Sequence, residues 1–156
     1  MTYNVGRLGP QELRTVYSSN TAAGVLTHGR CVAVRIGGTV ASDTGDGTGW
    51  GYAVDYPLAT SSICVGVLYS ADGSTYRAGS PALCIRQGVA TARIFATSTI
   101  GDLMVPYVGT KFGFCSAIGA ATPTSPILHY GIFGVSLAAT TGTTTVTGTM
   151  FVNSAV

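Results

Sequence analysis

Apolar residues recur at every second position in several segments of the chain after Gly29. The pattern is clearest in 30–36, 82–86 and 144–152, where the residues of one face alternate with those of the other. A period of two places successive side chains on opposite faces of a β-strand, so that one face lies in a core and the other contacts water or a partner. We therefore expect this part of the chain to consist of half-buried strands.

The spacing of these segments predicts an all-β fold. β-Branched residues and tyrosine dominate them, strong helix formers are nearly absent, and glycine recurs at short intervals. The predicted strands are 30–36, 50–55, 63–69, 81–87, 89–95, 103–108, 112–118, 127–137 (as two strands) and 144–152. Strands at this spacing without intervening helices are typical of a single antiparallel β-sandwich or an open rolled β-barrel.

Two residues indicate how neighbouring strands connect. Gly88 stands between 81–87 and 89–95 at hairpin distance, and glycine adopts a positive φ without steric cost. Pro106 lacks the N–H group that a central strand needs. These residues predict a hairpin centred on Gly88 and place 103–108 at a sheet edge or a bulge.

Residues 1–28 lack this alternation, and we interpret them as an N-terminal arm that precedes a β domain over 29–156. Within the arm, PQELRTVY has a proline suited to a first helical turn and apolar residues on one helical face. Eight residues are too few for a stable isolated helix, so we expect the arm to dock on a neighbour or across the domain. Its expected contact residues are Tyr3, Arg7, Leu13, Arg14 and Tyr17, because aromatic, leucine and arginine side chains are typical interface anchors.

Charge is scarce in this chain. Only 9% of the residues are charged, against about 25% in an ordinary domain, and seven of the eight basic residues are arginine. Arginine tolerates burial in interfaces better than lysine does, so we expect another protein to cover much of the surface. The net charge of +2 is small and scattered, which argues against nucleic acid as a partner. No apolar run approaches the roughly 18 residues of a membrane span, so we expect no membrane partner either.

The four cysteines are far apart in the sequence. No CxxC or cysteine–histidine cluster occurs, so nothing local would nucleate a zinc site. Each cysteine lies within a predicted strand, where a free thiol packs as a small apolar group. We expect Cys31, Cys64, Cys84 and Cys115 to be free thiols rather than a disulfide framework.

Candidate catalytic and metal-binding residues do not form a recognisable site. Asp43 and Asp46 lie in a glycine-rich loop, but the carboxylate ladder of a calcium loop is missing. Neither His28 nor His129 accompanies a nucleophile motif, and no paired carboxylates are evident. We expect a protein that is not an enzyme and that holds neither a metal nor a cofactor.

Trp50 and Tyr52 stand at the end of the 37–51 loop. They suit either an interface anchor or a stacking platform for a sugar. The neighbouring sequence lacks the Asp, Asn and Gln set that a sugar site uses, which favours the interface. We therefore add Trp50 and Tyr52 to the expected protein-interface residues.

The order of segments from 29 to 152 resembles that of the small head-decoration, or cement, proteins of tailed bacteriophages. The stretches that carry the resemblance are GRCVAVRI, PLATSSICVGVL, ALCIRQGVATARI, IGDLMV, IFGVSL and TVTGTMFV. The 37–51 loop is longer than the pattern of that family requires. Proteins of this family are β-rich, usually trimeric, and bind the outside of the phage head.

The resemblance implies that the chain clamps neighbouring capsomers and stabilises the expanded shell. Its implied partners are the major capsid protein and further copies of itself, as a homotrimer. Its implied location is the capsid exterior of a virion assembled in the host cytoplasm. Two alternatives stay open: a phage surface or tail module that recognises a host glycan or receptor through the 37–51 loop, and a structural component of a tail or baseplate.

Overall fold

Strands form all of the regular secondary structure in the part of the chain that the structure describes, which confirms the predicted all-β class. The structure is a computed structural model, and it describes residues 11–18, 26–34, 52–57, 62–77, 80–107, 113–118, 132–142 and 145–154. The strands are β1 (Glu12–Ser18), β2 (Leu26–Thr27), β3 (Cys31–Val34), β4 (Tyr52–Asp55), β5 (Cys64–Tyr69), β6 (Thr75–Tyr76), β7 (Pro81–Phe95), β8 (Leu103–Pro106), β9 (Cys115–Ala117), β10 (Gly134–Ser136) and β11 (Thr145–Asn153).

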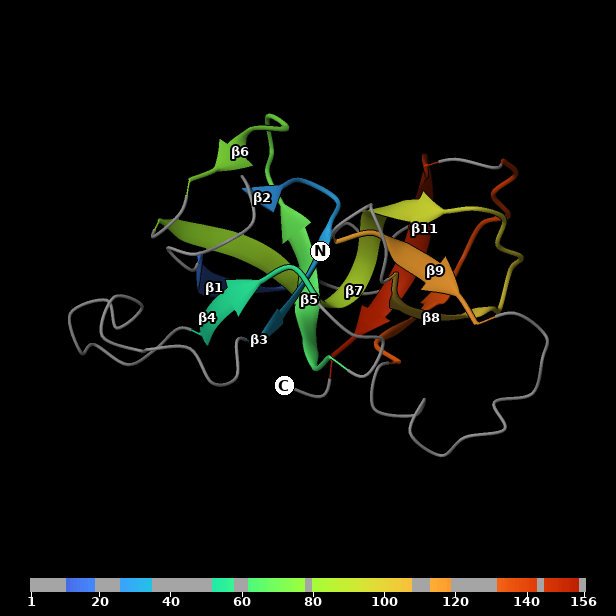
Figure 1. The fold of residues 1–156 in the computed structure, drawn as a ribbon, viewed down its shortest axis with the longest axis horizontal. Helices are drawn as coiled ribbons and strands as arrows, with labels where there is room; N and C mark the ends of the chain where they lie inside the picture. The colour runs from blue at the N-terminus through green and yellow to red at the C-terminus, as the bar shows by residue number, and fades with distance from the viewer. Residues whose placement is uncertain are drawn as a thin grey trace, which may run out of the picture.

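Nine of these strands form one sheet that closes on itself twice (Figure 1). The first closed ring runs β1-β4-β3-β5-β7 and returns to β1, whose residues pair antiparallel with the first half of β7. The second ring runs β7-β11-β10-β8-β9 and returns to β7 through the pair Ile94–Cys115. The β1–β4 and β7–β9 pairings are parallel, whereas the other pairings are antiparallel. Two barrel-like rings therefore share one strand.

The shared strand β7 corrects the predicted hairpin. Gly88 has a φ of +115°, yet β7 continues through it for 15 residues without reversing. Before this glycine β7 pairs with β1 and β5, and from Gln87 onward β7 pairs with β11 through nine residue pairs. Gly88 is therefore the point at which one strand leaves the first ring and enters the second.

The described part of the predicted arm belongs to the sheet. Glu12–Ser18 is a strand, so the helical prediction for PQELRTVY is wrong. Val16 is fully buried, and the backbone of β1 pairs with β4 on one side and β7 on the other. Leu26 is also fully buried and pairs with Tyr76 in the small β2–β6 sheet. These residues close the first ring and help to build its core rather than standing apart from the domain.

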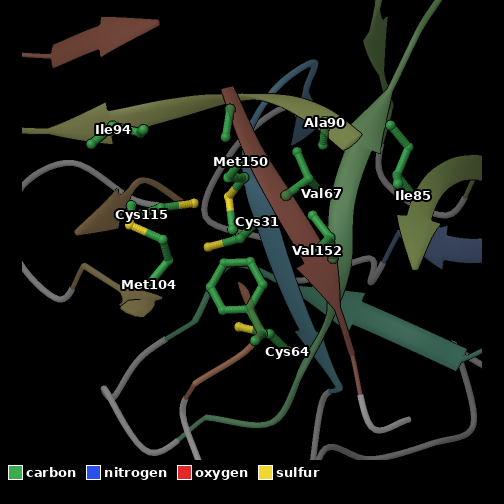
Figure 2. Close-up of a cluster of buried hydrophobic side chains, with 12 residues drawn as sticks. Cys31, Cys64, Val67, Ile85, Ala90, Ile94, Met104, Cys115, Met150 and Val152 are labelled. Atoms are coloured by element: carbon green, nitrogen blue, oxygen red, sulfur yellow. The ribbon is translucent and has the colours of Figure 1, made fainter. Parts of the chain in front are cut away.

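The core consists of two clusters that meet at β7. One fills the first ring and is formed by Val16, Leu26, Val32, Val54, Tyr56, Val65, Leu68, Ala82 and Cys84. The other contains the residues inside the second ring together with Cys31, Cys64, Val67 and Ile85, which come from the first ring (Figure 2). Because the second cluster extends onto strands of the first ring, the two rings share buried surface and form one folding unit.

Close backbone approach explains one glycine in this core. A Cβ atom on Gly66 would lie 2.2 Å from the carbonyl oxygen of Ile85, well inside any real contact distance. Gly66 pairs with Val32 where the register between β3 and β5 shifts. The close approach of the β7 backbone at this position therefore requires a residue without a side chain. No helix in the described residues is long and apolar enough to cross a membrane.

Candidate interaction surfaces

Charged side chains are divided unequally between the two rings. Among the described residues, those in the first ring and its connections are Glu12, Arg14, Arg30, Asp55, Asp72, Arg77 and Arg86. The described residues of the second ring beyond Gly88 hold only Arg93 and Asp102. Roughly a quarter to a third of an ordinary protein surface is charged, so the second ring is unusually neutral for a face in contact with water.

Most exposed positions among the described residues of the second ring are occupied by threonine, glycine or aliphatic residues instead. Besides Arg93 they are Thr91, Thr97, Thr99, Ile100, Gly101, Leu103, Ala139, Thr141, Gly142, Thr147 and Asn153. Depletion of charge is the compositional mark of the central part of a protein–protein interface. The second ring therefore has the composition of a surface that another protein covers.

A turn between β7 and β8 displays the most exposed large apolar side chain of the described residues. Ile100 is 72% exposed and Leu103 is 43% exposed; we call this pair the turn knob. The Asp102 carboxylate accepts a hydrogen bond of 2.7 Å from the Thr99 N–H, and Gly101, with a φ of +92°, donates its N–H to the Ser136 carbonyl at 2.9 Å. These bonds fix the backbone on which Ile100 stands.

A buried hydroxyl network holds the base of the same turn. Ser98, Ser136 and Thr140 are buried, and none of them is more than 4% exposed. The Ser98 hydroxyl lies 2.9 Å from that of Thr140 and 3.2 Å from that of Ser136. Backbone hydrogen bonds also join Ser98 and Thr140 in both directions, at 3.1 and 2.9 Å. The turn knob is therefore presented on a pre-organised support, which reduces the entropy lost when a partner binds.

A second apolar surface lies on the outer face of the first ring. Thr15 pairs with Leu83, and Leu13 pairs with Ile85, which has the same parity as Leu83 but is buried. Residues of the same parity share one face of the ladder, so Leu13, Thr15, Pro81 and Leu83 lie together, and all four are exposed. We call these four residues the sheet patch. It carries no charged side chain.

The structure does not gather the contact residues expected in the N-terminal arm on one surface. Leu13 lies in the sheet patch and is 45% exposed. Arg14 pairs with Cys84 on the inner face of the first ring, so its side chain belongs to the interior side of β1 and not to the outer face. Tyr17 lies on β1, where its backbone pairs with Ala53 beside Tyr52 of β4. Expected contacts at Tyr3, Arg7 and Trp50 lie outside the described residues, as does the 37–51 loop.

Sequence reasoning missed Ile100 and Leu83 as surface residues. Ile100 stands in a Thr-Ile-Gly-Asp turn, and an isolated isoleucine inside a turn sequence was the available signal. Leu83 follows the alternation of β7 and shares a face with Ile85, yet Leu83 is 39% exposed and Ile85 is buried. The difference arises because the second ring covers Ile85 and does not reach Leu83.

The four cysteines are free and buried. Cys31, Cys64 and Cys115 belong to the core that the two rings share, and Figure 2 shows Cys31 and Cys115 in the same part of it. Burial, together with the hydrogen bond to Cys31, raises the pKa of Cys64, and the hydrogen bond to Cys31 followed by burial raises that of Cys115. Burial raises the pKa of the Cys84 thiol to about 12, although Arg14 and Arg86 oppose the shift. The raised pKa values keep the thiols of Cys64, Cys84 and Cys115 protonated, so these three pack as apolar groups.

Ser70, Asp72 and His28 lie close together but do not form a catalytic triad. The Ser70 hydroxyl donates to the Asp72 carboxylate at 2.6 Å, and Nδ1 of His28 accepts from the Ser70 backbone N–H at 2.9 Å. The imidazole therefore contacts a backbone amide and not the hydroxyl that a general base would activate. Hydrogen bonds from Ser70 and Ser74 lower the pKa of Asp72, as expected for a carboxylate that caps a turn.

The side chain of Arg30 packs between residues of the first ring and the second ring. The Arg30 guanidinium lies 5.4 Å from the ring centroid of Tyr56 and 5.1 Å from that of Phe114. The Tyr56 hydroxyl accepts a 3.0 Å hydrogen bond from the Thr27 N–H. Because Phe114 directly precedes β9, this stack holds the start of β9 against the first ring. Arg30 therefore has an internal structural role.

No known protein-family model matches this chain, and no curated protein is similar enough to be reported as a relative.

Proposed function

We propose that this protein is a structural component of a tailed-phage virion that binds the outside of the head and stabilises the expanded shell. It is not an enzyme in this proposal, and its partners are the major capsid protein and further copies of itself, as a trimer. The segment order over 29–152 and the neutral surface of the second ring support it.

The unequal division of charge is the observation that carries the proposal. A charged first ring suits contact with water, whereas the second ring exposes mostly threonine and aliphatic side chains. Such a face would be poorly hydrated if it stayed bare on a separate protein. The second ring would therefore face the shell, and the first ring would face outward.

Stabilisation of the shell follows from linkage. A protein that binds only the expanded lattice shifts the equilibrium toward that lattice by mass action. Several copies in one assembly contact the shell together, so weak individual contacts add through a high effective concentration. No covalent chemistry is required of the protein.

A binding experiment with matched variants tests this proposal. Purified chain is mixed with expanded, DNA-free capsids that lack it, and the bound fraction is measured by sedimentation. Thr91 lies on the second-ring half of β7 and Thr75 lies on β6 beside the first ring, and both are exposed. We expect Thr91→Glu to reduce binding about tenfold or more, because it buries a charge in the contact. Thr75→Glu should bind as the wild type does.

Unexpanded shells provide the specificity control, and they should bind much less protein than expanded shells. If neither form of the capsid binds the wild-type chain, the decoration function is wrong. If Thr75→Glu abolishes binding and Thr91→Glu does not, the protein binds through the first ring and the proposed orientation is wrong.

A further inference from the structure

We propose that Cys31 and Cys115 form an oxidative modification site, at which hydrogen peroxide converts the two thiols to a disulfide that joins the first ring to the second. Cys31 lies on β3 of the first ring, and Cys115 lies on β9 of the second. Both residues are free thiols and fully buried. The inference goes beyond the proposed function and does not depend on capsid binding.

Backbone and side-chain contacts hold Cys31 against the start of β9. The Cys31 N–H donates to the Gly113 carbonyl at 2.7 Å, and the Cys31 Sγ lies 3.6 Å from the Phe114 carbonyl oxygen. A hydrogen bond also joins the side chains of Cys31 and Cys115. Figure 2 shows these two side chains pointing toward each other. The two sulfur atoms are therefore neighbours on strands that are fixed relative to one another.

The register of the sheet argues against Cys64 as the disulfide partner of Cys31. Strands β3 and β5 are antiparallel, with Ala33 opposite Cys64 and Cys31 opposite Val67. Cys31 and Cys64 are thus no closer than diagonal neighbours, whose Cα atoms lie about 7–8 Å apart. A disulfide joins residues whose Cα atoms are about 4.4–6.8 Å apart. Cys64 can donate a hydrogen bond to Cys31, but a disulfide between them would require the backbone to move.

Hydrogen bonding selects Cys31 as the thiol that reacts first. Burial raises the pKa of Cys31, but hydrogen bonds from Cys115 and Cys64 outweigh burial and lower this pKa. The pKa values of Cys115 and Cys64 are raised instead, so these two thiols keep their protons. The thiolate is the nucleophilic form of cysteine. Cys31 is therefore the nucleophile of the pair, and Cys115 is the thiol that resolves its oxidised form.

The reaction balances with peroxide as the only oxidant. The Cys31 thiolate attacks one peroxide oxygen, the O–O bond breaks, and the leaving hydroxide takes up a proton, which yields a sulfenic acid and water. The Cys115 sulfur then attacks the Cys31 sulfur, and its proton leaves with the hydroxyl group as a second water. Two thiols and one hydrogen peroxide thus give one disulfide and two waters.

Access and environment determine when this disulfide forms. Hydrogen peroxide is scarcely larger than water, so local opening of the core admits it, whereas a larger reagent requires more extensive unfolding. A reducing cytosol keeps such thiols reduced, and an oxidising environment allows the disulfide to persist. Because the cross-link joins residues far apart in the sequence, it restricts the unfolded chain and should stabilise the folded one.

Mass spectrometry of the folded full chain tests the proposal. The protein is incubated with hydrogen peroxide, catalase removes the peroxide, and the chain is denatured without reductant and alkylated. The four free thiols should fall to two, and digestion should give a disulfide-linked peptide pair that contains Cys31 and Cys115. The oxidised protein should also unfold at a higher urea concentration than the reduced protein. Dithiothreitol added to the denatured chain should restore all four thiols.

Three variants distinguish this pair from the neighbouring thiols. Cys84→Ala removes a thiol of the other core cluster and should form the Cys31–Cys115 disulfide as the wild type does. Cys64→Ala should form it more slowly, because Cys31 loses one hydrogen-bond donor. Cys115→Ala should not form it. Circular dichroism shows whether each variant retains the β fold.

The wild type alone can overturn the proposal. Four alkylated thiols after peroxide treatment, oxidation of methionine without loss of thiols, a disulfide between chains, or a disulfide from Cys31 to Cys64 would each do so. An oxidised protein that unfolds at a lower urea concentration would overturn the stabilising role of the cross-link. None of these outcomes involves capsid binding, so they leave the proposed function to its own experiment.

Discussion

The hydroxyl of Ser98 lies 2.9 Å from the hydroxyl of Thr140, although 42 residues separate them in the sequence. The same two residues form an isolated antiparallel bridge, and both are almost fully buried. This relationship ties the turn after β7 to the segment after β10. It explains how an isoleucine that is 72% exposed can stand on a fixed backbone. A fixed, exposed, aliphatic side chain is the property that an interface anchor requires.

Removal of the Ser98 hydroxyl should destabilise the protein. Ser98→Ala leaves two buried hydroxyls, on Ser136 and Thr140, without one partner each, and we expect a loss of about 1–3 kcal/mol in the free energy of unfolding. Urea denaturation followed by circular dichroism measures this loss. The control is Thr97→Ala, at an exposed neighbouring position, where the change should stay within about 0.5 kcal/mol. Equal stability of the two variants would contradict the role of the hydroxyl network.

A side chain at position 66 should be poorly tolerated. The Cβ atom of Gly66→Ala would lie 2.2 Å from the Ile85 carbonyl oxygen, so β5 and β7 must separate, and we expect a cost of about 2–4 kcal/mol. Gly73→Ala is the matched control, because Gly73 has a φ of +72° but no atom within 4 Å of the added Cβ. Its backbone strain alone should cost about 1–2 kcal/mol. Chemical unfolding measures the free energy of unfolding of both variants. A smaller loss for Gly66→Ala than for Gly73→Ala would disprove the close approach of β5 and β7.

The Asp72 turn cap should contribute stability that depends on pH. Hydrogen bonds from Ser70 and Ser74 hold the pKa of Asp72 below its ordinary value of 3.8. A carboxyl group whose folded pKa is depressed contributes its full stability above the ordinary value, and the contribution is lost as the pH falls through the folded value. Asp72→Ala should therefore unfold at a lower urea concentration than the wild type at pH 7. The difference between the urea concentrations at which the two proteins unfold should be smaller at about pH 2.5 than at pH 7. An equal difference at both pH values would contradict this role of Asp72.

The buried thiols should resist large thiol reagents while the protein stays folded. The pKa of Cys84 is raised to about 12 by burial, so at pH 8 this thiol is protonated and lacks the reactive thiolate form. We expect a disulfide reagent such as Ellman's reagent to label the native protein only as fast as it unfolds. The denatured, unreduced chain should react at four thiols, one for each of its free cysteines. Rapid labelling of a native thiol would show that the core is open.

The sequence pattern predicts strands best where one face of the strand is apolar and the other is polar. The stretches around β3 and β11 are predicted from their alternation, and those around β5 and β8 from their β-branched and apolar composition. The hairpin at Gly88 was wrong because Gly88 suits a turn and a bend in a continuous strand equally well. A better signal was available: Ala82, Cys84, Ala90 and Ala92 have the same parity, so the alternation continues through the glycine. All four are buried inside the rings.

The strand β1 could not be found from hydropathy because its pattern is inverted. Arg14 belongs to the inner face of the first ring, whereas Leu13 lies on the outer face and is 45% exposed. An apolar outer residue beside a basic inner one removes the alternation that identifies a half-buried strand. The same inversion places Leu13 in the sheet patch. Which of these residues are exposed therefore depends on ring closure, a long-range property that local patterns do not encode.

Electron-microscopic reconstruction of the virion tests the decoration function most directly. The account predicts protein density outside the expanded shell, shaped as two joined rings, with the neutral second ring against the capsid and the charged first ring facing solvent. Virions produced without the chain should lack this density and lose their DNA at a lower temperature. Virions with no such external density, or with the chain located only in the tail, would contradict the account.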